Sequence, residues 1–399
     1  MRRAIQLCIG LTLAAAALHC AGQSATAPDH QRQTALALEQ AGKNSEAETA
    51  WRGFLKTHPS SPEPYAHLGL LEARQERYKE AVPFYRKALA LDPAFSGLRL
   101  NLGLALFKAG EMKDAIQTFQ PLLKNQPLSS AEAQRLTILV GMAHYALGEF
   151  AEAALYLRQA AANDRGNLGL RLSLAHSCMW SKQYQCVMDT YHEILLLNAE
   201  SAEADMLAGE ALDELKDHRG AIEQFRAAVQ ANSKEPDVHF GLGYLLWTQR
   251  QYPEAVGEFQ AELANNPNHS QALTYMADAE MQMSHPETAE PLLEKAEQMD
   301  PALFMAHLDL GILLTDAGRQ EDALRELNAA AKLKPEDVNV HWRLGRLYRA
   351  MGKTDLAKTE FDKASSITKA ADDALIDKIS GPHAAGKPQA GAADVPGNK

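Results

Sequence analysis

Apolar residues recur along most of this chain at the spacing of one face of a helix. In the stretch that begins at Pro62, the residues Ala81, Tyr85 and Ala88 follow one another in steps of three to four. Such steps bring side chains onto the same helical face, where they pack against a neighbouring element. The chain is also rich in Ala, Leu, Glu and Gln, which favour helices over strands. The pattern therefore predicts an all-α protein.

The pattern repeats with a period of 34 residues, and ten units are predicted within 28–371. A period of this length indicates one helical hairpin per unit, stacked so that neighbouring hairpins bury a shared core. The predicted units are 28–61, 62–95, 96–129, 134–167, 168–201, 202–235, 236–269, 270–303, 304–337 and 338–371.

The second unit, PEPYAHLGLLEARQERYKEAVPFYRKALALDPAF, resembles the tetratricopeptide repeat (TPR) family. It carries the family's Leu68-Gly69, followed by Tyr78 and Ala81 and then by an aromatic residue, an alanine and a proline at the expected places. The resemblance covers 28–371, and together with the N-terminal segment described below it suggests a TPR protein of the exported bacterial type. It implies a right-handed superhelical solenoid of about ten helix-turn-helix repeats.

Four positions of the repeat have a clear physical purpose. A small residue at the eighth position, such as Gly69, and alanine at the twentieth allow the two helices to approach closely. Glycine at the fifteenth position supplies the left-handed backbone that ends the first helix. The turns between repeats carry proline, which cannot continue the second helix: Pro59, Pro93, Pro127, Pro267, Pro301 and Pro335.

Two irregularities are expected. Pro121 lies inside the second helix of the third repeat, where it should kink or shorten that helix. Four extra residues, 130–133, precede the fourth repeat, and the run from Ser129 to Glu132 resembles a capping box. We expect one added helical turn there, with a longer loop as the alternative. Residues 372–380 are predicted to form a C-terminal capping helix, and 381–399 a disordered tail.

The N-terminal segment 1–22 has the order of a signal peptide. Arg2 and Arg3 precede an apolar stretch from Ala4 to Leu18, which small residues follow. This largely apolar stretch of fifteen residues is shorter than the roughly 20 residues that span a bilayer. We therefore expect export to the periplasm or beyond, cleavage near Gly22 or Ser24, and no transmembrane segment afterwards. The alternatives are an uncleaved N-terminal anchor and a lipoprotein attached through Cys20.

Charge and motifs exclude several classes of function. The net charge is -11, and no basic stripe interleaved with aromatic residues appears, so nucleic acid is not an expected partner. No catalytic, cofactor-binding or metal-binding motif is present, so we expect no enzyme activity, no cofactor and no metal. His239, His307 and His341 share the fourth position of their repeats, and we interpret them as packing residues rather than metal ligands.

Cys178 and Cys186 are the only cysteines outside the N-terminal segment. They belong to the two helices of the fifth repeat. An exported protein could join them in a disulfide, whereas the alternative is a pair of buried thiols that pack as small apolar side chains.

The first helix of each TPR unit lines a concave groove, and the resemblance implies which positions face it. Those positions are apolar or aromatic from the third repeat to the seventh, and again in the tenth: Leu104, Phe107, Met142, Tyr145, Met179, Trp180, Phe240, Tyr244, Trp247 and Trp342. Charges interrupt the groove at Glu210, Asp213 and Glu214 in the sixth repeat and at Arg346 and Arg349 in the tenth. The alternative is that these side chains only pack between neighbouring first helices.

One branch of the family, the sugar-transferase superhelix, carries a ladder of asparagines at the sixth position of its repeats. Here that position holds one asparagine in ten, so the ladder is absent: Gln33, His67, Asn101, Leu139, Ser173, Leu207, Gly241, Tyr275, Asp309 and Arg343.

Aromatic anchors flanked by charges suit a groove that holds a peptide or helix. The sequence thus predicts a non-catalytic scaffold that binds a protein or peptide segment outside the cytoplasm. A periplasmic accessory factor for polysaccharide export or envelope assembly is the alternative. The oligomeric state and the partner are left open.

Overall fold

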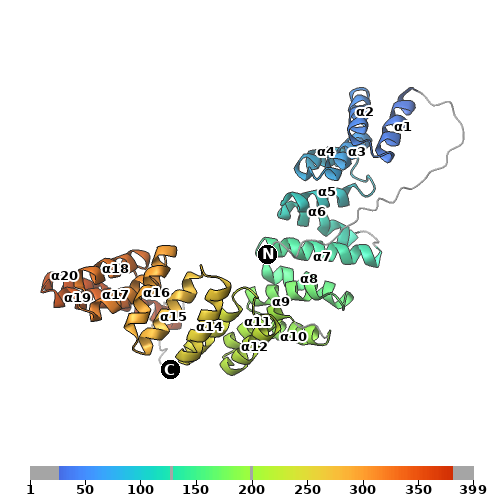
Figure 1. The fold of residues 1–399 in the computed structure, drawn as a ribbon. Coiled ribbons are helices and arrows are strands. Elements are labelled where there is room, and N and C mark those ends of the chain that lie inside the picture. The colour runs from blue at the N-terminus through green and yellow to red at the C-terminus, as the bar shows by residue number, and fades with distance from the viewer. Residues whose placement is uncertain (1–26, 126–128, 198–200, 381–399) are drawn as a thin grey trace, which may run out of the picture. The chain divides into compact units, whose positions relative to one another are not determined.

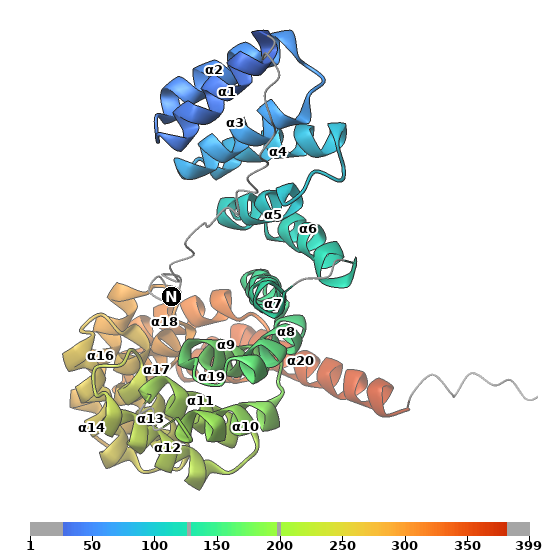
Figure 2. The ribbon, with the colours of Figure 1, turned by 90° about the vertical axis from the view of Figure 1, so that its right-hand side faces the viewer.

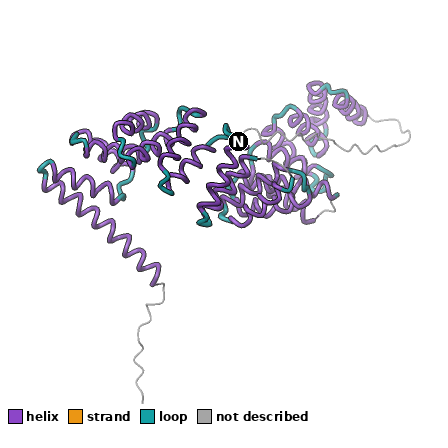
Figure 3. Tube along the Cα trace, turned by 60° about the horizontal axis from the view of Figure 1, so that its bottom comes forward, coloured by secondary structure: helices purple, strands orange, loops and turns teal. Residues whose placement is uncertain are grey.

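The computed structural model describes residues 27–125, 129–197 and 201–380, and these residues form twenty helices and no strand (Figures 1 and 3). The helices pair into ten hairpins, which confirms the predicted all-α repeat fold. The predicted signal segment 1–22 and tail 381–399 lie outside the described residues. Within the described part of the chain, no helix is long and apolar enough to cross a membrane.

The chain divides into two compact units, Met1–Ala231 and Asn232–Lys399. The first unit holds α1 Ala27–Gln40, α2 Asn44–Thr57, α3 Pro62–Arg74, α4 Tyr78–Leu91, α5 Leu98–Ala109, α6 Met112–Asn125, α7 Ser130–Ala146, α8 Phe150–Asn163, α9 Leu168–Trp180, α10 Tyr184–Leu195, α11 Ala202–Glu214 and α12 His218–Ala231. Its first three hairpins stack one after another in Figure 2. The second unit holds α13 Val238–Thr248, α14 Tyr252–Asn265, α15 Ser270–Gln282, α16 Pro286–Met299, α17 Phe304–Asp316, α18 Gln320–Leu333, α19 Val338–Ala350 and α20 Thr354–Ser380.

The turn inside each hairpin has the same backbone geometry in all ten repeats. The predicted glycines at the fifteenth position, among them Gly110 at φ 85°, are left-handed as expected. In the other five repeats a residue with a side chain takes the same conformation: Glu76, Lys182, Lys216, Arg250 and Ser284. The hairpin thus requires a left-handed residue at this position, whichever amino acid stands there.

The small residue at the eighth position sets how closely the two helices of a hairpin pack. A Cβ atom built on Gly103 would lie 2.3 Å from the ring of Phe119 on the second helix. At Gly243 the same atom would lie 2.7 Å from the ring of Phe259. Both rings are fully buried. The small eighth residue therefore allows the two helices to approach closely, as the sequence predicts, and the ring on the second helix packs directly against it.

The fourth repeat begins with the added turn that the sequence predicts. Helix α7 starts at Ser130 and has 17 residues. The Ser129 hydroxyl accepts a hydrogen bond from the Glu132 backbone N–H, and the Glu132 carboxylate accepts one from the Ser129 backbone, which completes the capping box. Pro121 lies within α6, which keeps 14 residues and is not shortened.

The segment 372–380 continues the second helix of the last repeat without a break. Helix α20 runs for 27 residues to Ser380, so the predicted capping helix is an extension of α20 and not a separate element. Residues 371–376 of this helix are exposed, because they extend beyond α19, the first helix of the tenth repeat.

Candidate functional site

An aromatic cluster lies on the first helices of the second unit. Tyr244 and Trp247 from α13 meet Tyr275 from α15, with ring centroids 5.3 and 5.0 Å from that of Tyr275. Phe240, one turn earlier on α13, lies 5.9 Å from the same ring. The three predicted groove residues of the seventh repeat are thus joined by Tyr275, which the groove prediction omitted.

Two acidic side chains lie beside this cluster. Asp278, one turn after Tyr275 on α15, accepts a hydrogen bond from the Trp247 indole N–H at 2.6 Å. Asp309, on α17, is only 5% exposed, and among the described residues its Oδ2 has no hydrogen-bond partner. Burial, followed by the nearby charge of Asp278, raises the pKa of the Asp309 carboxyl to about 8, and Arg343 of α19 opposes the change. A buried carboxyl without a full set of partners is costly to ionise.

Part of the aromatic cluster is accessible. Tyr244 is 36% exposed, whereas Phe240, Trp247 and Tyr275 are half-buried among their neighbours. Burial, followed by the nearby Tyr244, Asp278 and Asp309, raises the pKa of Tyr275. The cluster therefore combines packing between first helices with a face that a ligand could reach.

The predicted groove residues of the tenth repeat form a separate group. Trp342 is exposed and its ring lies 5.0 Å from that of Phe361 on α20. The Arg349 guanidinium lies over the same Phe361 ring at 5.6 Å, and Arg346 is exposed. This group adds positive charge to the first-helix face of the second unit.

The predicted groove residues of the first unit are mostly half-buried. Leu104 and Phe107 pack against one core cluster, and Met142, Tyr145 and Met179 against the next. Trp180 is the exception, being 65% exposed and stacked on Phe150 at 5.9 Å. Among the predicted charges on α11, Glu210 and Glu214 are exposed, whereas Asp213 pairs with His218 at 2.7 Å. In this unit, much of the predicted groove is packing between helices.

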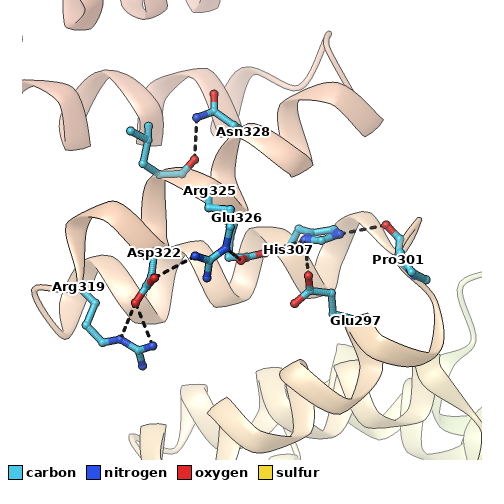
Figure 4. Close-up of polar contacts among 9 residues, drawn as sticks. Glu297, Pro301, His307, Arg319, Asp322, Arg325, Glu326 and Asn328 are labelled. Carbon is cyan, nitrogen blue, oxygen red and sulfur yellow. Dashed lines mark hydrogen bonds and ion pairs between the residues drawn. The ribbon is translucent and has the colours of Figure 1, made fainter.

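The three fourth-position histidines are buried, and each contacts a glutamate 19 residues later on the second helix of its own repeat. The pairs are His239–Glu258 at 2.6 Å, His307–Glu326 at 2.9 Å and His341–Glu360 at 2.6 Å. His307 also faces Glu297 of the preceding repeat at 3.8 Å (Figure 4). These histidines are thus buried, as the sequence predicts, but each also forms a polar contact with a glutamate that was not predicted. In the ninth repeat, His307 faces a second carboxylate, that of Glu297.

Cys178 at the end of α9 and Cys186 at the start of α10 are joined in the structure, with their Cα atoms 5.8 Å apart. That separation lies within the range of protein disulfides. Both residues are buried, and the Arg158 guanidinium donates to the Cys186 sulfur at 2.9 Å. The sequence allowed either a disulfide or two free thiols, and the fold brings the two cysteines together. The bond itself stays a prediction, which counting the free thiols tests.

The paired helices and their spacing agree with the family comparison. Tetratricopeptide-repeat models match residues 32–94, 72–137, 189–236, 206–270 and 338–370, and a TPR repeat model matches 311–352. Together they cover more than half of the chain. This chain is a tetratricopeptide-repeat protein.

This TPR chain is similar to several larger proteins at low sequence identity. BBSome complex member BBS4 of Bos taurus is 21% identical over 338 residues, 82% of this chain and 64% of that protein. Cellulose synthase operon protein C of Xanthomonas axonopodis pv. citri is 27% identical over 322 residues, 78% of this chain and 18% of that protein. The TPR chain thus spans between 18% and 64% of the length of these relatives.

Among solved structures, YrrB, described as a TPR protein with an unusual peptide-binding site, aligns with a TM-score of 0.39 and 20% identity. The alignment covers 47% of this TPR chain and 97% of that one.

The residues missing from the groove prediction carried a signal in the repeat. Tyr275 and Asp309 occupy the sixth position of their repeats and Asp278 the ninth. Polar or aromatic residues at the sixth position of adjacent repeats are the sequence signal for this part of the TPR face.

Proposed function

We propose that this TPR protein is an exported, non-catalytic scaffold that holds a protein or peptide segment against the first-helix face of its second unit. The observation that carries the proposal is the cluster of Phe240, Tyr244, Trp247 and Tyr275 beside two aspartates. Tetratricopeptide-repeat proteins act as protein-interaction scaffolds, which supports the same reading of this chain.

The side chains on the first-helix face of the second unit indicate which kind of partner segment could bind there. Exposed aromatic surface offers area that an apolar side chain of a partner can bury. The exposed Arg346 and Arg349 on α19 add positive charge to the same first-helix face. A segment with an apolar anchor, flanked by polar groups that match these charges, fits the proposal.

The experiment compares one groove substitution with one outside the groove. Tyr244→Ala removes the most exposed ring of the cluster, and Leu155→Ala removes an exposed apolar side chain from the second helix α8. A partner is first captured by crosslinking in the native cell, and its affinity for purified variants is then measured. We expect Tyr244→Ala to weaken binding at least tenfold and Leu155→Ala to leave it unchanged. Equal affinities for all three proteins would show that this face is not the site.

An accessory function in polysaccharide export or envelope assembly is the second candidate. The observation that favours it is the similarity to cellulose synthase operon protein C over 78% of this chain. Crosslinking would then recover components of an export or assembly machine. Recovery of unrelated soluble proteins alone would contradict this candidate and leave the scaffold proposal intact.

Location outside the cytoplasm rests on the N-terminal sequence, with Arg2 and Arg3 before an apolar stretch and small residues. The N-terminus of the protein isolated from cells tests it by mass spectrometry. We expect a mature chain that begins near Gly22 or Ser24. An intact Met1 terminus on protein recovered from the cytoplasmic fraction would contradict the export proposal.

A further inference from the structure

Three potential metal ligands from three helices meet within the second unit. Glu297 lies on α16, His307 on α17 and Glu326 on α18, and one ligand atom from each lies within 4.8 Å of the others. The His307 Nδ1 atom lies 2.9 Å from the Glu326 carboxylate and 3.8 Å from that of Glu297. Figure 4 shows the imidazole between the helices, with Glu297 on one side.

The hydrogen bonds of His307 decide what its Nδ1 atom offers. Its Nε2 atom lies 3.1 Å from the Pro301 carbonyl oxygen, which can only accept, so Nε2 carries a proton. A neutral ring then presents the Nδ1 lone pair to two carboxylates. A second ring proton would satisfy the nearer carboxylate, but it would leave Glu297 with only a distant contact. A divalent cation satisfies all three groups at once.

The tenth repeat provides an internal comparison. His341 makes the same two contacts, to Glu360 at 2.6 Å and to the Pro335 carbonyl at 2.9 Å. However, Ala331 stands where the ninth repeat faces Glu297, and the Lys363 ammonium lies 2.7 Å from Glu360. In both repeats a cation contacts the second oxygen of the glutamate, Lys363 at Glu360 and Arg325 at Glu326. The ninth repeat therefore differs by its second carboxylate, that of Glu297, beside the imidazole.

Another group with suitable ligand types, Asp237, Glu262 and His269, is excluded by its hydrogen bonds. The His269 Nδ1 atom accepts from the Ala272 backbone N–H at 3.1 Å, so the ring proton is on Nε2, which faces Asp237 at 3.2 Å. Neither ring nitrogen has a lone pair to offer. The arrangement around His307 differs because its Nδ1 atom faces the two carboxylates and accepts no backbone hydrogen bond from the described part of the chain.

We propose that Glu297, His307 and Glu326 bind a zinc ion that joins the eighth and ninth repeats. Two ligands of a tetrahedral zinc ion, each about 2.0–2.1 Å from the metal, lie about 3.3 Å apart. The observed distances of 2.9 and 3.8 Å from Nδ1 bracket that spacing. Three protein ligands leave the fourth position for water.

The surroundings of the three residues have the features of a supported metal site. The Pro301 carbonyl fixes the orientation of the His307 ring, as outer partners of metal-binding histidines commonly do. The second Glu326 oxygen accepts from the Arg325 guanidinium at 3.0 Å, and Asp322 holds that guanidinium in turn. The Glu297 side chain is 34% exposed, which provides a route for the ion.

The test measures Zn²⁺ binding to the tag-free full chain by calorimetry, together with the thermal midpoint with and without Zn²⁺. Glu297→Gln removes one ligand from a partly exposed position, and Glu360→Gln makes the same change at the tie of the tenth repeat. We expect one saturable site in the wild type and in Glu360→Gln, with affinities within twofold. Glu297→Gln should weaken binding at least tenfold and reduce the thermal shift, because a ligand that binds only the folded state stabilises it.

Circular dichroism of each variant establishes that it is folded before binding is measured. The proposal is overturned if the wild type shows no saturable site, or if folded Glu297→Gln binds Zn²⁺ as well as the wild type. His307 and Glu326 would then form a structural tie like that of the tenth repeat. Metal binding is measured without any partner protein, so this result is independent of the scaffold proposal.

Discussion

The buried Asp309 makes stability depend on pH in a direction that can be calculated. The pKa of this carboxyl rises from 3.8 to about 8 on folding, because burial disfavours the charged form. Between these two values the folded chain holds a proton that the unfolded chain has released. The free energy of unfolding therefore falls as the pH rises from about 4 to about 8.

The size of the effect follows from the same shift. Each unit of pKa shift corresponds to about 1.4 kcal/mol, so the cost of keeping Asp309 in its site reaches about 4 kcal/mol at pH 7. Asp309→Asn keeps the shape of the side chain and cannot ionise. Its amide N–H groups need partners, which adds a cost of about 1–3 kcal/mol that does not depend on pH.

The assay is urea unfolding at pH 4 and pH 7 for the wild type, Asp309→Asn and Asp316→Asn. Asp316 is exposed at the end of the same helix and is the matched control. We expect the difference between Asp309→Asn and the wild type to move by about 4 kcal/mol in favour of the variant between the two pH values. Asp316→Asn should follow the wild type. Parallel profiles for all three proteins would refute the assignment of a protonated Asp309.

Two further predictions concern the hairpin turns and the cysteines. Lys216→Gly should stabilise the fold by about 0.5–1 kcal/mol in urea unfolding, because its left-handed strain of about 1–2 kcal/mol exceeds the entropy that glycine loses on folding. Lys87→Gly, at an exposed position inside α4 of the same unit, should instead destabilise it by about 1 kcal/mol, and stabilisation by both changes would refute the strain argument. Alkylation of the unreduced, denatured mature chain, followed by mass spectrometry, should label neither Cys178 nor Cys186. Labelling of both would rule out the bond.

Features that repeat every 34 residues could be predicted from the sequence, because each is required by the packing or the turn within a single hairpin. Gly103 had to be small because the second helix presents Phe119 to it, and Gly110 had to be left-handed because the first helix ends there. The five substituted turns at the same position, Lys216 among them, were not predicted. These five residues carry side chains and are therefore not expected in the left-handed conformation. Their place at the fifteenth position of the repeat nevertheless requires it.

The sites between repeats were harder to predict, because they depend on which side chains meet across neighbouring hairpins. Tyr275 meets Trp247 from the preceding repeat, and Glu297 meets His307 from the following one. Each residue alone resembles an ordinary packing or surface residue. Two patterns in the repeat register were visible in the sequence: the recurring histidine and glutamate 19 residues apart, as in His307 and Glu326, and the sixth position that Tyr275 occupies.

The central claim is that a partner lies on the first-helix face of the second unit, and site-specific photo-crosslinking in the cell tests it most directly. A photo-reactive residue is placed at position 244, in the exposed aromatic cluster, or at position 260, where Gln260 is exposed on the second helix α14. The account predicts a discrete crosslinked partner from position 244 and none from position 260. The same partner captured equally from both positions, or from position 260 alone, would contradict it.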